Sequence, residues 1–154
     1  ELILAHRDEL ALLETIDMGK PIGDSLAVDI PATARCIAWY AEAVDKIYDE
    51  IAPTGAHALA LITREPMGVV GVIVPWNYPM IMAAWKLGPA LAAGNSGVLK
   101  PSEKSPLSAL RRAEIAGDAG EPGRELVLIN DHRQRHVVLV PEQSDTGGKA
   151  IHRA

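Results

Sequence analysis

Polar side chains follow two apolar, valine-rich runs of this sequence, at the points where the runs end. Pro-Trp-Asn-Tyr-Pro (75–79) follows the first run, and Lys-Pro-Ser-Glu (100–103) follows the second. An amide can donate hydrogen bonds to a developing negative charge, and a cation with a carboxylate suits the hydroxyl groups of a ribose. If the runs are parallel strands of one sheet, both phrases lie at its carboxyl edge, where such sheets bind ligands.

Asn77 has two interpretations from its position alone. It stands two residues before Pro79, a residue type that suits the first turn of a helix. Its amide and nearby backbone N–H groups could converge on an oxyanion. Asparagine is also among the preferred helix-capping residues, and spacing alone favours this structural role.

Lys100 and Glu103 also have two interpretations. An acidic residue that hydrogen-bonds a ribose is a common device of dinucleotide-binding folds. The alternative is an ordinary ion pair in a solvated loop, which spacing alone favours. The sequence contains no Gly-x-Gly-x-x-Gly, so the usual pyrophosphate-binding loop of such folds is absent from it.

Two helices are predicted at the start of the chain. Apolar residues at helical spacing predict an amphipathic first helix that stops at Gly-Lys-Pro (19–21). Asp29 and Pro31 predict the N-cap and first turn of a second helix, which ends before Pro-Thr-Gly (53–55). The predicted buried faces are Ile3, Leu10, Leu13 and Ile16 in the first helix, and Ile37, Ala41, Val44, Tyr48 and Ile51 in the second.

The rest of the chain alternates between predicted strands and helices. Alternating residues from Ala58 to Arg64, followed by turn residues, predict a hairpin into the run Val69 to Val74. Further elements are predicted as a buried helix (80–92), a strand (97–99), a helix (105–116) and strands at 126–129 and 137–140. This order is typical of a parallel sheet with right-handed crossovers, so we expect an α/β fold with a partial Rossmann-like sheet and flanking helices.

Composition narrows the classes of partner. The formal net charge is -5 over 154 residues, so nucleic acid and anionic membranes are not expected partners. Prolines and asparagines interrupt the most apolar stretch, Met67 to Lys100, which argues against a membrane span. A single cysteine excludes an internal disulfide and no signal-peptide pattern opens the chain, so we expect a cytoplasmic protein.

No nucleophile or metal centre is predicted. Cys36 lies within the second predicted helix and is interpreted as a small core residue. His132 and His136 have the spacing of one helix face, but no third ligand is identifiable, so no metal site is expected.

Three phrases together resemble the cofactor-binding core of the aldehyde dehydrogenase superfamily. They are Pro-Trp-Asn-Tyr-Pro, Trp-Lys-Leu-Gly-Pro-Ala-Leu-Ala-Ala-Gly-Asn (85–95) and Leu-Lys-Pro-Ser-Glu (99–103), and the likeness covers about three quarters of the chain. Residues 29–35 with 39–42 are most similar to the branch that acts on aminoaldehydes, including γ-glutamylated aminobutyraldehyde. The resemblance implies NAD(P)-dependent oxidation of an aldehyde to a carboxylic acid.

The resemblance also implies a role for each residue of the two phrases. Asn77 would donate its amide to the oxyanion of a thiohemiacetal, and Pro75 and Trp76 would line the cofactor cleft. Lys100 and Glu103 would bind the adenosine ribose. Glu103 favours NAD over the alternative, NADP, because a carboxylate repels a 2′-phosphate.

Residues 1–130 are expected to form part of an NAD(P)-binding domain, and residues 131–154 a divergent tail. The predicted hairpin, residues 58–71, resembles the oligomerisation strands of the family. A homo-oligomer is therefore expected for a complete form of the protein. The small-molecule partners are an aldehyde and the dinucleotide.

Aldehyde dehydrogenase chemistry needs a cysteine thiolate and a glutamate that activates water. The resemblance places both in segments beyond the end of this chain. Because the chain also begins without methionine inside a predicted helix, we expect a fragment that is inactive alone. Two alternatives stay open, a non-catalytic nucleotide-binding or oligomerisation module and a remnant without function.

Overall fold

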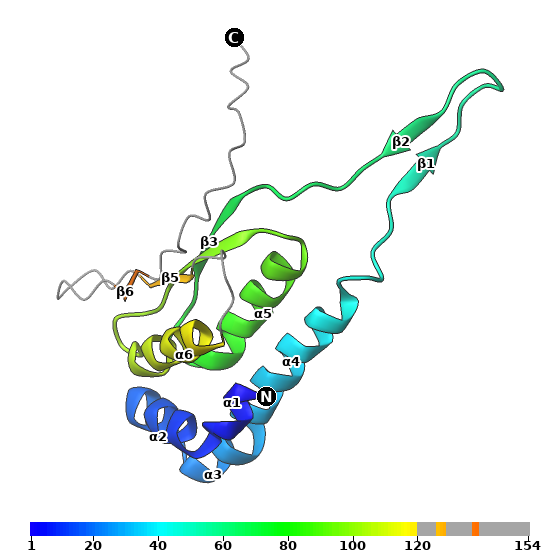
Figure 1. Ribbon diagram of the computed structural model, residues 1–154. Helices are drawn as coiled ribbons and strands as arrows, with labels where there is room; N and C mark the ends of the chain where they lie inside the picture. Colours follow the sequence, from blue (N-terminus) through cyan, green and yellow to red (C-terminus); the bar gives the residue numbers. More distant parts are fainter. Residues whose placement is uncertain (120–125, 129–136, 139–154) are drawn as a thin grey trace.

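The computed structural model describes residues 1–119, 126–128 and 137–138 (Figure 1). Its helices are α1 (Leu2–Ala5), α2 (Arg7–Met18), α3 (Ile22–Asp24), the π-helical turn η1 (Ser25–Asp29), α4 (Ile30–Ala43), α5 (Pro79–Ala92) and α6 (Leu107–Asp118). Its strands are β1 (Glu50–Ala52), β2 (Ala60–Ile62), β3 (Val69–Ile73), β4 (Ser96–Lys100), β5 (Leu126–Leu128) and β6 (Val137–Val138). No described helix is long and apolar enough to cross a bilayer.

The larger sheet has the strand order β3-β4-β5-β6. β3, β4 and β5 are parallel, and β6 is antiparallel to β5. Helices α5 and α6 make the two crossovers between the parallel strands, as the alternating pattern predicts. The predicted α/β class with a partial Rossmann-like sheet is confirmed. Of the strand predicted at 137–140, only the two residues of β6 lie within the described part of the chain.

One hydrophobic cluster lies between the sheet and helices α5 and α6. Its buried members are Val72, Val74, Ala83, Leu87, Leu99, Ala109 and Ala113. α4 crosses α5 closely at Gly88, where an added Cβ would lie 2.6 Å from the ring of Tyr40. The predicted helix over 80–92 is confirmed, and Gly94, with a φ of 83°, follows its end.

A second hydrophobic cluster joins the N-terminal helices to the start of α5. Its buried members are Leu10, Ala11, Ile30, Met80 and Ile115. The predicted first helix is present but is interrupted at His6, and Gly19 ends it in the left-handed conformation with a φ of 74°. On its predicted face Leu10 is fully buried, whereas Ile16 is 61% exposed.

The second helix differs from the prediction at both ends. Asp29 is the N-cap residue of α4 and Pro31 lies in its first turn, as predicted, but the chain is already helical from Ile22 through η1, so Asp29 has helical backbone angles and forms no side-chain cap. Burial explains the difference, because the Asp29 side chain is used in an ion pair with Lys20. At the other end the helix stops at Ala43, and the predicted buried face is wrong because Val44 (56%), Tyr48 (76%) and Ile51 (71%) are exposed.

The predicted hairpin between Ala58–Arg64 and Val69–Val74 is also wrong. β2 pairs instead with β1 in an antiparallel register that sets Ile51 opposite Leu61. These two strands form an arm that projects from the body of the fold (Figure 1). β3 is committed to the sheet because pairing with β4 buries Val72 in the core.

Two charged side chains are buried without a hydrogen-bond partner for their terminal atoms among the described residues. Glu14 on α2 is fully buried, and burial, followed by the nearby charge of Asp29, raises its pKa to about 7. Arg112 on α6 is 4% exposed, and burial lowers its pKa to about 10. Both groups cost stability, because a charge that loses water without a partner is poorly solvated.

Arg112→Leu should raise the free energy of unfolding by about 1 kcal/mol or more, because it removes the desolvated charge and keeps apolar volume. Urea denaturation at neutral pH measures the change. The matched control is Arg111→Leu: Arg111 is partly exposed and bonded to Glu9 and Glu114, so its loss should bring no gain. An Arg112→Leu variant less stable than the original chain would contradict the expectation.

Glu14→Gln should flatten the pH dependence of stability. Between pH 4.5, where the free carboxyl titrates, and about pH 7, the folded state binds more protons than the unfolded state. Stability contributed by protonated Glu14 is therefore present below this window and is lost as the pH rises through it. The variant should gain on the order of 3 kcal/mol above the window, measured by urea denaturation across the pH range. Glu42→Gln, which removes an exposed carboxyl of α4, should reproduce the original pH profile, and an unchanged profile for Glu14→Gln would refute the assignment.

Candidate functional site

The two polar phrases lie at the same edge of the sheet, as their positions in the sequence predict. β3 and β4 are adjacent parallel strands in which Ile73 is opposite Lys100. The Val74 N–H continues the ladder by donating to the Lys100 carbonyl oxygen at 3.1 Å. Residues 75–79 and 100–103 therefore leave neighbouring strands at the carboxyl edge, which is the ligand-binding edge of open α/β sheets.

Asn77 does not cap the helix that follows it. The N-cap of α5 is Tyr78, no side chain forms a capping hydrogen bond, and Pro79 occupies the first turn. The structural alternative for Asn77 is therefore wrong, and its amide is left exposed at the sheet edge. Pro75 and Trp76 are exposed beside it, with 49% of Trp76 accessible.

Asn95 shows what a structural asparagine looks like in the same fold. Its side-chain oxygen accepts from the Gly68 N–H at 3.1 Å, and its amide nitrogen donates to the Ala90 carbonyl at 3.2 Å. It is 7% exposed and ties the end of α5 to the start of β3. Asn77, by contrast, is exposed, and this exposure fits a side-chain amide that is available to a ligand.

Lys100 and Glu103 contact each other at the end of β4. The Lys100 Nζ and Glu103 Oε1 atoms are 3.4 Å apart, and their side chains are 34% and 46% exposed. This contact is the ion pair that the structural interpretation expects, and such exposed pairs contribute little stability. The same exposure leaves both groups within reach of a hydroxylated ligand, so the geometry fits either interpretation.

A buried ion pair lies against the residue that follows Asn77. The Lys20 Nζ is 4.2 Å from the centre of the Tyr78 ring and also bonds the carboxylate of Asp29. The fully buried Glu14 carboxyl interacts electrostatically with both members of this pair. The backbone N–H of Met80 opposes the rise in the Glu14 pKa, although it does not reach hydrogen-bond geometry.

Sequence reasoning missed Lys20, Asp29 and Glu14 as neighbours of the site. From the sequence, Gly-Lys-Pro indicates only the stop of the first helix, and Asp29 only the N-cap of the second. The available signal was a lysine held between the helix-ending Gly19 and Pro21, a position that restricts where its side chain reaches. The partner of that lysine depends on tertiary contacts and could not be inferred.

Cys36 shows no sign of an activated thiol. It lies on α4, is half-buried, and burial raises the pKa of its thiol. A nucleophilic cysteine needs the opposite shift, toward the thiolate. No group of three or more His, Cys, Asp or Glu side chains that could hold a metal occurs in the described part of the chain, and His132 and His136 lie outside it.

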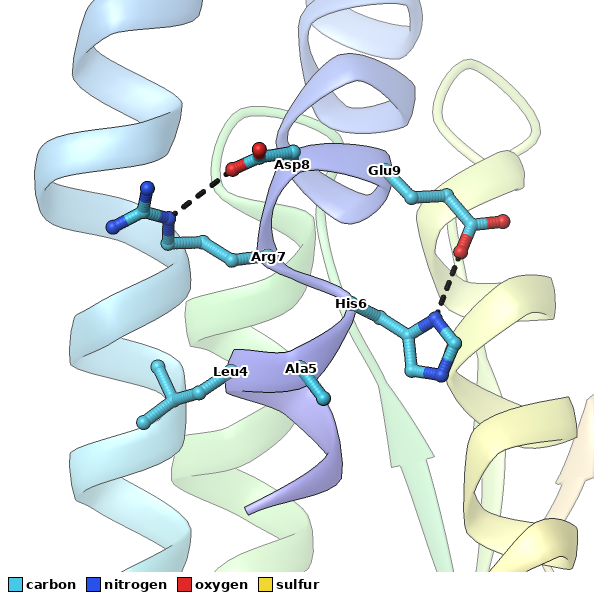
Figure 2. Close-up of a pocket in the computed structure, with 6 residues that line it drawn as sticks. All are labelled: Leu4, Ala5, His6, Arg7, Asp8 and Glu9. Atoms are coloured by element: carbon cyan, nitrogen blue, oxygen red, sulfur yellow. Dashed lines mark hydrogen bonds and ion pairs between the residues drawn. The ribbon is translucent and has the colours of Figure 1, made fainter.

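A surface hollow is formed by the α1–α2 junction (Figure 2). Its lining residues are Leu4, Ala5, His6, Arg7, Asp8 and Glu9. Arg7 pairs with Asp8 at 3.3 Å, and the His6 Nδ1 and Glu9 Oε2 atoms are in hydrogen-bond contact at 3.0 Å, so the polar side chains of the hollow already contact one another. None of these residues belongs to the two phrases at the sheet edge.

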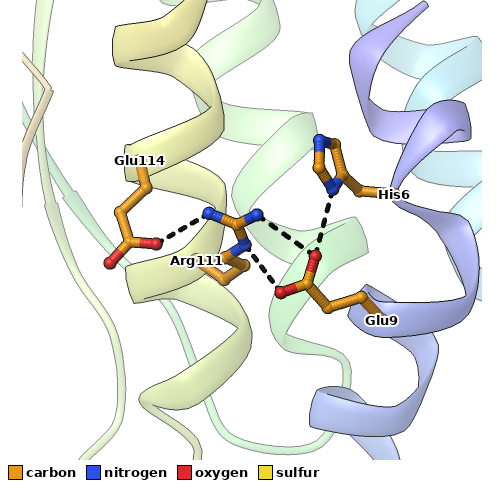
Figure 3. A network of polar contacts seen from close by, with 4 residues as sticks. All are labelled: His6, Glu9, Arg111 and Glu114. Atoms are coloured by element: carbon orange, nitrogen blue, oxygen red, sulfur yellow. Dashed lines mark hydrogen bonds and ion pairs between the residues drawn. The ribbon is translucent and has the colours of Figure 1, made fainter.

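Glu9 also ties α2 to α6 (Figure 3). Its two carboxylate oxygens accept from Arg111 Nε at 2.8 Å and from a terminal nitrogen at 3.2 Å, while Arg111 donates to Glu114 at 2.9 Å. The Arg111 hydrogen bond is the largest cause that lowers the pKa of Glu9, and His6 adds to it. This network is structural, because its charged groups are paired with one another.

Most of this chain matches proteins of known family. The model of the aldehyde dehydrogenase family matches residues 1–143. The NADP/NAD-dependent aldehyde dehydrogenase PuuC of Escherichia coli is 64% identical over 129 residues, covering 84% of this chain and 26% of that protein. The aminoacetaldehyde dehydrogenase of Pseudomonas aeruginosa is 53% identical over 122 residues, covering 79% of this chain and 25% of that protein.

Solved structures agree with the sequence matches. AldA, the indole-3-acetaldehyde dehydrogenase of P. syringae in complex with NAD+, has a TM-score of 0.80 at 61% identity, over 83% of this chain and 26% of that chain. The γ-glutamyl-γ-aminobutyraldehyde dehydrogenase of Burkholderia cenocepacia has a TM-score of 0.77 at 61% identity, over 79% of this chain and 25% of that chain. The chain thus spans about a quarter of the length of the curated relatives it matches. With its match over residues 1–143 and its parallel sheet edge, the chain belongs to the aldehyde dehydrogenase family.

Proposed function

We propose that the protein oxidises an aldehyde to a carboxylic acid with NAD+, and that this chain supplies part of its cofactor and oxyanion site. The observation that carries the proposal is the in-register pairing of β3 and β4, which brings both polar phrases to one sheet edge. The exposed Asn77 amide, which is not used as a helix cap, supports it. Residues 1–130 would then be part of the cofactor domain, and residues 131–154 a divergent tail.

Asn77 would stabilise the charge that develops on the aldehyde oxygen. Attack of a thiolate on the aldehyde carbon moves an electron pair to that oxygen, and a donated amide hydrogen bond stabilises the resulting oxyanion. A dinucleotide held at this sheet edge would supply the acceptor for the hydride that leaves this carbon. Cys36, the single cysteine of the sequence, is not activated, so the chain alone should not turn over.

Lys100 and Glu103 would hold the adenosine ribose, beside a cleft lined by Pro75 and Trp76. The partly exposed lysine and the exposed carboxylate at the end of β4 have the hydrogen-bonding groups that ribose hydroxyls need. The Glu103 carboxylate favours NAD, because it would repel the 2′-phosphate of NADP. This preference comes from one charge, so NADP is expected to bind more weakly rather than not at all.

The proposed substrate class is the aldehydes that carry an amino or amide nitrogen. Two similar proteins are named as aminoacetaldehyde and γ-glutamyl-γ-aminobutyraldehyde dehydrogenases. Indole-3-acetaldehyde dehydrogenases are similar to the same degree, so an arylacetaldehyde belongs in the same substrate panel.

We further propose that a complete form is a cytoplasmic homo-oligomer that associates through the β1–β2 arm. The arm has an exposed antiparallel edge, and Leu59 (71%), Leu61 (60%) and Ile51 (71%) are accessible on it. Such unpaired apolar edges favour strand or surface pairing with another copy. The net charge of -5 argues against nucleic acid and anionic membrane as partners.

Glu103→Gln should weaken NAD binding about tenfold, because it exchanges a charged acceptor for a neutral one. It should weaken NADP binding less, so the preference for NAD should shrink. Titration of the purified chain with NADH and NADPH, followed by ligand fluorescence, measures both affinities. Lys104→Ala is the matched control on the same loop and should leave the NADH affinity unchanged. Equal NADH affinity of Glu103→Gln and the original chain would remove the ribose assignment.

Asn77→Ala should lower kcat about 100-fold or more in a form of the protein that oxidises aldehydes, as removal of an oxyanion donor does. The KM for NAD should change little. Steady-state NADH formation with aminoaldehydes and indole-3-acetaldehyde measures both constants. Glu103→Gln provides the opposite pattern, with a raised KM for NAD and a retained kcat. A retained kcat for Asn77→Ala would overturn the oxyanion role.

A further inference from the structure

Lys20 contacts the aromatic ring of the residue next to Asn77. Asn77 and Tyr78 belong to the turn between β3 and α5, and both are exposed. The Lys20 Nζ lies 4.2 Å from the centre of the Tyr78 ring, within the distance of about 6 Å at which a cation is attracted to a ring face. This is a defined tertiary contact of the turn that carries the proposed oxyanion donor.

The position of Lys20 is set by its own surroundings. Gly19 ends α2 in the left-handed conformation and donates its N–H to the Thr15 carbonyl at 2.8 Å, so the chain turns sharply before Lys20. The Lys20 ammonium bonds the carboxylate of Asp29, and these side chains are only 14% and 2% exposed. With so little water around it, the ammonium interacts more strongly with both neighbours than a surface lysine would.

Asp29 is itself placed by the π-helical turn η1. This turn packs against α2, where the hydroxyl oxygens of Thr15 and Ser25 are 3.2 Å apart. Asp29 is the last residue of this turn, and its side chain is buried where it bonds Lys20. Single π turns inside helices often occur near functional sites. A chain of contacts thus runs from η1 through Asp29 and Lys20 to Tyr78.

We propose that Lys20 is a positioning residue for Asn77: by holding the Tyr78 ring from one side and Asp29 from the other, it fixes the direction of the neighbouring amide. The inference rests on the proposed oxyanion role of Asn77. Its structural part, that Lys20 orders the turn, stands on the contacts of Lys20 alone.

NMR relaxation of the 154-residue chain tests the inference without turnover. In Lys20→Met, which keeps the aliphatic stem and removes the charge, the order parameter of the Tyr78 backbone should fall from about 0.85 to below about 0.6, and that of the Asn77 side-chain amide should fall with it. Lys20→Arg should restore them, because a guanidinium can bind both a carboxylate and a ring face. Unchanged order parameters in Lys20→Met, or no rescue by arginine, would overturn the proposal.

Two further variants separate positioning from a general loss of stability. Ile115→Val weakens the hydrophobic cluster that joins the N-terminal helices to Met80 at the start of α5, and it does not alter Lys20. It should therefore leave the Asn77 amide ordered. Tyr78→Leu removes the ring while the Lys20–Asp29 pair stays, and should loosen Asn77 even if Lys20→Met does not fold. Loosening in Ile115→Val as large as in Lys20→Met would refute the proposal, as would an ordered amide in Tyr78→Leu.

Steady-state kinetics test the effect of Lys20 on turnover separately from the NMR experiment. In a form of the protein that turns over, Lys20→Met should lower kcat about tenfold with the KM for NAD retained, and Lys20→Arg should recover it, since a misdirected donor stabilises the oxyanion less. Failure of the oxyanion role itself would show as a retained kcat in Asn77→Ala. Failure of the positioning role would show as a full kcat in Lys20→Met beside a reduced kcat in Asn77→Ala.

Discussion

The parallel ladder between β3 and β4 determines where every candidate site residue lies. Its register sets Ile73 opposite Lys100, and the Val74 N–H extends it by one further hydrogen bond. A shift of one residue would turn Val72 and Leu99 out of the core, so the buried face holds the register. The two polar phrases are neighbours because the hydrophobic face of the sheet can be buried in only one way.

The start of α5 is where the two halves of the core meet. Met80 packs with Leu10, Ile30 and Ile115, while Ala83 and Leu87 further along the helix pack against the sheet. The turn that carries Asn77 is therefore anchored at one end by β3 and at the other by the N-terminal helices. Such support is what an exposed hydrogen-bond donor needs if it is to keep one direction.

Charged groups in this fold have different roles according to their burial. The Lys20–Asp29 pair is desolvated and specific, whereas the Lys100–Glu103 pair is exposed and contributes little to stability. Among the described residues Glu14 and Arg112 have no such hydrogen-bond partner, and burial shifts the pKa of each toward its neutral form.

Local sequence determined the parts of this protein whose signal lies within a few residues: the α5 helix with Pro79 at its start, the left-handed stop at Gly19, the β4 strand and the family phrases around Asn77 and Lys100. It did not determine the partner of β2, the end of α4 or the role of Asp29. Those outcomes depend on contacts between distant residues, where burial and pairing outweigh local preference. Strand pairing and the Lys20–Asp29–Tyr78 contacts were therefore decided only by the tertiary structure, because no local pattern encodes which surfaces will exclude water together.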